Sequence, residues 1–184
     1  PKQLGGGVKD TLTIHGFQFG ATRGNGNLYP SSSDLEFYYD GSDPQRGVGL
    51  VFEDLKIPQG ASIKYAYIDF VAKSSTSGAV VTEINIVDSA NISNPDNFYL
   101  NGVPSNLLAG PTWNTEANWS VNNTYRTPDL STLVQNVIDK TGWALDNNMA
   151  FFLEGTAGYH KARSYSSPGS AAKLRIGYEG QWEP

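Results

Sequence analysis

Residues 47–70 constrain the fold most strongly, because they hold two apolar runs that are joined by a short turn. The second run, 63–70, alternates between two sides, and one side consists of Ile63, Tyr65, Tyr67 and Asp69. A period of two indicates a β-strand. Pro58 and Gly60 suit the tight turn between the runs, because proline presets its own φ and glycine accepts a positive one. Since sequential strands usually neighbour each other, we predict that 48–52 and 63–70 form an antiparallel pair within a β-sandwich.

Similar patterns place the remaining elements. Alternation predicts strands at 10–19, 34–40 and 79–88, and closing strands at 149–153 and 173–178, with a loop at 160–167 between the last two. Only 130–138 has a helical period, with Thr127 as the expected N-cap and Gly142 as the expected C-cap. Residues 88–123 lack a sustained period, and so long a loop is usually functional or hides short elements.

Composition narrows the class of protein. The chain has 184 residues, 39% of them hydrophobic, which is enough for one domain with a sizeable core. A net charge of −5 without a basic run argues against nucleic acid as a partner, and no apolar stretch is long enough to insert into a membrane. The absence of cysteine argues against a disulfide scaffold and a thiol enzyme. We predict a linker at 1–8, one mainly β two-sheet antiparallel sandwich (jelly roll) with one short amphipathic helix at 9–180, and a tail at 181–184.

The sequence contains few groups for catalysis. It has two histidines, His15 and His160, and none of the common nucleophile, zinc-protease or phosphate-loop motifs. Asp34 and Glu36 would share one face of a strand, so they could serve a glycosidase, hold a metal, or simply face solvent. We predict that they bind a structural calcium ion, because calcium takes several oxygen ligands. The neighbouring residues with oxygen-bearing side chains are Asn25, Asn27, Ser31, Ser32, Ser33, Asp40 and Asp43.

Aromatic residues offer either sugar stacking or core packing. We expect Trp143 in the core after the helix, architectural roles for Trp113 and Trp119, and Trp182 in the tail. Residues 158–165 combine aromatic rings with basic side chains, and Arg163 there could bind an acidic sugar substituent or pair with a buried carboxylate. The expected ligand residues are Tyr125, Tyr159, His160, Lys161, Arg163 and Tyr165.

Several strings resemble a known group of bacterial jelly-roll modules, namely SSSDLEFYYDG, VGLVFEDLKIPQGASIKYAYIDFVA, W-x5-W, TPDLSTLVQNVIDKTGW, ARSYSS and AKLRIGY. This group is similar to DNRLRE-type domains and to several carbohydrate-binding module families, and the resemblance covers roughly 11–178. Such modules are appended to secreted polysaccharide-degrading enzymes and cell-surface proteins. The resemblance implies a non-catalytic, calcium-bearing, carbohydrate-binding or adhesive module.

The sequence therefore predicts a secreted or surface-attached bacterial module that binds a polysaccharide, acidic or sulfated in nature, through aromatic and basic side chains in loops. We expect no catalytic activity, and a monomeric domain tethered to other domains of a longer chain. The alternatives are a structural or adhesive domain of a large surface protein and a small polysaccharide lyase or hydrolase. Exposed aromatic rings would favour the polysaccharide-binding module. A deep cleft with paired carboxylates would favour the lyase or hydrolase.

Overall fold

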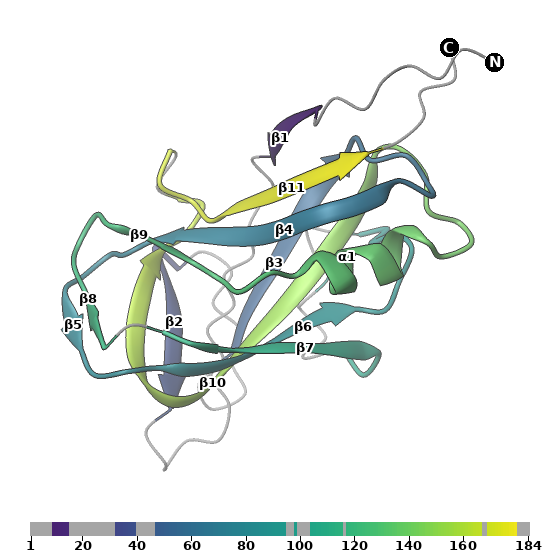
Figure 1. Ribbon diagram of the computed structural model, residues 1–184. Helices are drawn as coiled ribbons and strands as arrows, with labels where there is room; N and C mark the ends of the chain where they lie inside the picture. The colour runs from purple at the N-terminus through teal and green to yellow at the C-terminus, as the bar shows by residue number, and fades with distance from the viewer. Residues whose placement is uncertain are drawn as a thin grey trace.

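The computed structural model of the protein describes residues 9–14, 32–39, 47–94, 98, 104–115, 117–166 and 169–179. The predicted linker and tail lie outside these residues. The described part is mainly β, with antiparallel sheets and one short helix, so the predicted sandwich class is confirmed (Figure 1). The elements are β1 (Lys9–Ile14), β2 (Asp34–Tyr39), β3 (Gly47–Leu55), β4 (Ser62–Val71), β5 (Thr76–Ser77), β6 (Val81–Val87), β7 (Leu107–Asn114), β8 (Asn118–Trp119), β9 (Thr124–Arg126), α1 (Ser131–Ile138), β10 (Asn147–Arg163) and β11 (Lys173–Glu179).

The strands form two main sheets. One has the order β1-β11-β4-β9, and the other has the order β2-β10-β6-β7 with β3 also paired to β10. In Figure 1 β4 and β11 lie above β6 and β7, and the long β10 runs obliquely behind them. Ile68 and Phe70 of the first sheet and Phe37 and Phe151 of the second are fully or almost fully buried in one core cluster. The core therefore fills the space between the two sheets.

Strand β10 is 17 residues long and joins the larger sheet together. Its first part pairs with β3 and β6, and its last part, from Gly158 to Arg163, pairs with β2. The predicted loop at 160–167 is therefore wrong for 160–163. Gly158 has a φ of 77°, and a β-carbon there would overlap the carbonyl of Ala79, so the path of β10 requires glycine at this position.

The predicted pairing of 48–52 with 63–70 is wrong. Strand β3 pairs with β10, whereas β4 pairs with β11 and β9 in the other sheet. The turn at Pro58 and Gly60 therefore crosses from one sheet to the other. Both strands are correctly predicted as strands, and they contribute apolar residues to the shared core from opposite sheets.

Residues 127–135 cover the edge of β4 that β9 leaves open. Thr127 Oγ1 accepts a hydrogen bond from Ile68 N (3.0 Å), Asp129 Oδ1 from Ala66 N (2.9 Å), and Gln135 Oε1 from Ile63 N (2.8 Å). The predicted caps of the helix are therefore wrong: Leu130 is the N-cap of α1 and Asp139 is the C-cap. The Thr127 hydroxyl satisfies a strand donor instead of a helix donor.

The segment 88–123 contains strands that its irregular pattern conceals. Strand β7 pairs with β6 at the edge of the larger sheet, and β8 pairs with β5. Next to them, Ile92 and Phe98 pack with Phe152 in a second apolar cluster, which lies on the opposite side of β3 and β10 from the main core. Strands β3 and β10 are therefore buried on both faces, which explains their continuous apolar runs.

We expect Ile68→Ala and Leu133→Ala each to lower the free energy of unfolding by about 2–5 kcal/mol, because each removes methyl groups from the core. Ile68 is fully buried in β4, and Leu133 is buried on α1. Urea denaturation measures the loss, with Thr132→Ala on the exposed side of α1 as the control. An unfolding midpoint equal to that of the control would contradict the assigned packing.

Candidate functional site

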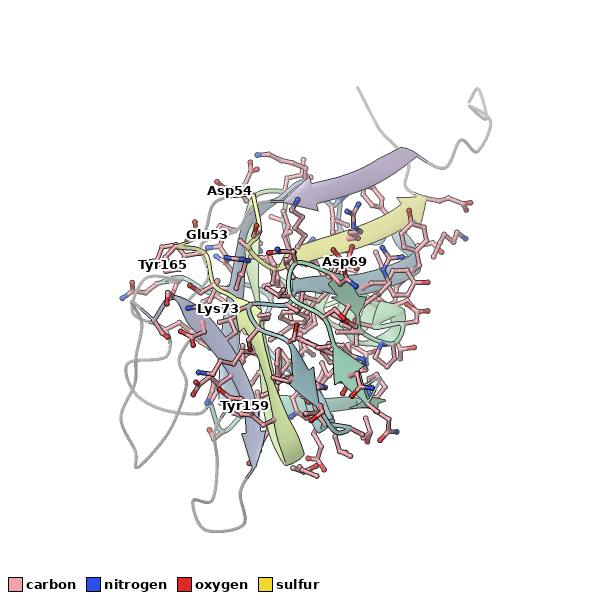
Figure 2. All side chains as sticks on the ribbon, turned by 90° about the vertical axis from the view of Figure 1, so that its left-hand side faces the viewer. Glu53, Asp54, Asp69, Lys73, Tyr159 and Tyr165 are labelled. Atoms are coloured by element: carbon pink, nitrogen blue, oxygen red, sulfur yellow. The ribbon has the colours of Figure 1, made fainter. Side chains whose placement is uncertain are left out.

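The outer face of β10 carries three of the predicted ligand residues. The strand register places Lys161 opposite Glu36 and Arg163 opposite Asp34, and Tyr159 precedes them on the same side. We call this set, Asp34, Glu36, Tyr159, Lys161 and Arg163, the β10 face. Figure 2 shows Tyr159 and Lys73 on the side of the sandwich that carries β2, and Asp69 on the other side.

Ion pairs occupy the carboxylates of the β10 face. Lys161 Nζ lies 3.2 Å from Asp34 Oδ2 and 2.7 Å from Glu36 Oε1, and Lys73 Nζ lies 3.1 Å from Asp34 Oδ1. Burial raises the pKa of Asp34, but hydrogen bonds from Lys73 and Lys161 outweigh it and hold that pKa below its usual value. The hydrogen bond to Glu36 raises the pKa of Lys161. The two lysines and the two carboxylates therefore balance each other.

Arg163 donates one hydrogen bond from Nη2 to Asn122 Oδ1 (2.8 Å). Its Nε is buried without a hydrogen-bond partner among the described residues, and none of them places a carboxylate on its guanidinium. The predicted pairing of Arg163 with a buried carboxylate is therefore not found in the described part of the chain. Tyr159 lies under Lys161, with Nζ 5.4 Å from the ring centroid, and Tyr165 is half-buried in the turn that follows β10.

Two predicted ligand residues instead stack on Trp119. The Trp119 ring lies between Tyr125, at 4.4 Å and an interplanar angle of 4°, and His160, at 4.5 Å and 12°. His160 is fully buried, and its Nδ1 shares a 2.6 Å hydrogen bond with Thr76 Oγ1. Such burial is incompatible with a ligand contact by His160. Its role is to hold β10 against the β5-β8 pair.

A hollow of about 570 Å³ opens beside this stack, within the range of ~300–1,000 Å³ that is typical of small-ligand sites. Its walls come from the end of β7, from β8 and from the segment around β9. They combine aromatic rings with amide and hydroxyl groups, and the lining residues are Trp113, Asn114, Thr115, Trp119, Asn123, Thr124, Tyr125 and Arg126. Tyr125 is therefore the predicted ligand residue that borders the hollow.

The rings around the hollow are held in place from behind. Trp113 stacks on Phe70 at 5.6 Å, and Trp119 contacts Phe37 at 6.0 Å. The Tyr125 hydroxyl accepts a 2.7 Å hydrogen bond from Ser120 N, which ties β9 to the turn before it. Trp113 and Trp119 are buried, as their expected architectural role requires, and Trp143 is buried with its Nε1 donating to Ile57 O at 2.9 Å.

Arg126, which lines the hollow, also binds the buried carboxylate of β4. Arg126 Nε and Nη2 lie 2.7 and 3.0 Å from the two oxygens of Asp69, and Arg175 Nε lies 2.5 Å from Asp69 Oδ2. Burial raises the pKa of Asp69, but the hydrogen bonds from Arg126 and Arg175 outweigh it and hold that pKa below its usual value. Asp69 therefore stays charged and fixes both arginines.

Sequence reasoning missed Asn114, Thr124, Arg126 and Arg175. Each lies near a strand end or on a strand face that only the sheet order brings to the hollow or to Asp69. One signal was present, because the alternation of β4 placed Asp69 on the same side as two tyrosines. An acidic residue on an otherwise aromatic strand face needs a cationic partner from the neighbouring strands.

Comparison with protein-family models gives no match, and comparison with curated proteins finds no relative of significant similarity. Within the described ranges, no group of three or more His, Cys, Asp or Glu side chains is placed to hold a metal ion. The helix of the described part is too short to cross a membrane. The predicted contributions of Asn25, Asn27, Ser31, Asp40 and Asp43 to a calcium site lie outside the described residues.

Calcium binding by Asp34 and Glu36 stays a prediction with a direct test. If calcium displaces Lys161 from these carboxylates, EDTA lowers the melting temperature and added calcium restores it, because a ligand of the native state stabilises that state. We expect Glu36→Gln to abolish this response. A melting temperature that is the same with EDTA and with calcium would contradict the calcium site and leave the lysines as the partners of both carboxylates.

Proposed function

We propose that this domain binds a polysaccharide without changing it, and that the hollow beside Tyr125 receives one of the sugar units. The observation that carries the proposal is the lining of the hollow, which brings Asn and Thr side chains together with the half-buried ring of Tyr125. Sugar rings present hydroxyl groups around their edge and C–H groups on their faces. Amide and hydroxyl groups match the former, and aromatic rings match the latter.

The fixed position of the rings supports this proposal. Tyr125 is held by its stack on Trp119 and by the hydrogen bond from Ser120, so its ring is not free to reorient when a ligand arrives. A site whose side chains are already ordered loses less conformational entropy on binding. Asn114, Asn123 and Thr124 are exposed at the mouth of the hollow, where they can exchange water for sugar hydroxyls.

The state of Asp34 and Glu36 supports a non-catalytic role. A glycosidase needs one carboxyl group that donates a proton and another that attacks or activates water. Lysine ammonium groups contact both of these carboxylates, and the hydrogen bonds to Asp34 favour its ionised form over the proton-donating one. The proposal places the domain in a secreted or surface protein of a bacterium, tethered to other domains.

We expect Asn114→Ala and Thr124→Ala each to weaken glycan binding about 3- to 10-fold, which corresponds to the loss of one hydrogen bond. Affinity electrophoresis against a panel of neutral and acidic polysaccharides measures the change. Asn136→Ala, on the exposed side of α1 and outside the hollow, is the matched control.

Three outcomes would contradict the proposal. Binding that is equally strong in all three variants would remove the hollow as the site. An absence of binding to every polysaccharide would favour a structural or adhesive domain. Release of sugar from any polysaccharide by the wild type would identify an enzyme instead.

A further inference from the structure

The outer face of β4 and its neighbours carries a second cluster of aromatic and charged side chains. Ala66, Ile68 and Phe70 point to the core, so the alternating residues of β4 point outward. The register places Gly177 and Arg175 of β11 on one side of them, and Arg126 of β9 on the other. We call this set, Tyr65, Tyr67, Asp69, Arg126 and Arg175, the arginine strip.

The aromatic part of the strip orders the side chains. Tyr65 and Tyr67 stack at a centroid distance of 5.6 Å with an interplanar angle of 20°, and the guanidinium of Arg126 lies 5.0 Å from the Tyr67 centroid. A β-carbon at Gly177 would overlap the Tyr65 ring, so glycine there lets the ring lie against β11. Arg126 is therefore fixed on two sides, by a ring and by a carboxylate.

The charges of the strip do not balance. Asp69 is 6% exposed beneath two arginine side chains that are 52% and 32% exposed, and the register adds Lys173 opposite Asp69. One carboxylate thus faces three cations, in a chain whose net charge is −5. The β10 face carries a smaller excess, because two carboxylates there stand against Lys73, Lys161 and Arg163.

The arginines also keep unused donors. Each guanidinium has five N–H groups. Three of the ten bind Asp69, and the others have no partner among the described residues. Carboxylate and sulfate oxygens are the acceptors that match a guanidinium best, because two parallel N–H groups can reach two oxygens of one group.

We propose that Arg126 and Arg175 bind the carboxylate or sulfate groups of an acidic polysaccharide whose neighbouring sugar unit occupies the hollow. Arg126 belongs to both places, since it contacts Tyr67 and Asp69 on the strip and also lines the hollow. The inference rests on the proposed function and adds the chemical class of the glycan. It moves the recognition of acidic groups from the β10 face to the opposite sheet.

The test compares three polymers, which are neutral dextran, polygalacturonate with carboxylates and dextran sulfate with sulfates. Affinity electrophoresis or calorimetry is run at two salt concentrations on the wild type, Arg175→Gln, Arg175→Lys and Arg163→Gln. Arg163 is the matched control, because it lies on the other sheet and has no ion pair in the described part. Arg175→Lys keeps the charge next to Asp69, and melting curves show whether each variant is folded.

We expect the wild type to bind one acidic polymer more tightly than dextran, and more weakly at high salt. Arg175→Gln should weaken that binding about tenfold, Arg175→Lys should weaken it less, and Arg163→Gln should not change it. Equal loss in Arg175→Gln and Arg163→Gln would mean general charge attraction and would overturn the inference. Unchanged acidic binding in both Arg175 variants would also overturn it.

The same measurements separate this inference from the proposed function. If dextran or another neutral glycan binds and the hollow variants weaken it, while no acidic polymer binds more tightly, the inference fails and the proposed function stands. If no polymer of any kind binds the wild type, both fail. The polymer that responds to Arg175→Gln distinguishes carboxylate from sulfate as the recognised group.

Discussion

Strand β10 is the constraint on which the rest of the structure depends. It pairs with β3 and β6 through its first part and with β2 through its last. Strand β10 is therefore the common partner that holds β2, β3 and β6 in one sheet. Its inward residues reach both the main core and the stack on Trp119. The change of partner coincides with Gly158, whose positive φ and close approach to Ala79 leave no room for a side chain.

The sequence predicts the strands of this fold far better than their partners. Alternation identifies β2, β4, β6 and β11 almost to their ends, because one face of each meets the core. The pairing of β3 with β4 was nevertheless wrong, since a short turn can either reverse a strand within one sheet or cross to the other. Strand β7 was missed because only Trp113 of its eight residues is buried, so its pattern is weak.

For the site as well, the sequence predicts candidate residues better than it predicts which of them come together. The sequence predicts Tyr125, which borders the hollow, as a loop tyrosine, and His160, which is buried, as a member of the basic and aromatic stretch 158–165. A shift of one position along a strand decides between core and surface, and no local pattern signalled that β10 continues as far as Arg163. Arg126 and Arg175 meet only because β9 and β11 flank β4, so their shared contact with Asp69 depends on the sheet order.

The central claim is that glycan binding occurs at the hollow and the arginine strip rather than at the β10 face. Titration of the ¹⁵N-labelled domain with short fragments of an acidic polysaccharide tests it directly, because backbone amide and arginine Nε–H signals report each surface separately. The account predicts shifts at Asn114, Thr124, Arg126 and Arg175, with Arg163 unaffected. Shifts confined to Tyr159, Lys161 and Arg163 would contradict it, and so would a spectrum that the glycan leaves unchanged.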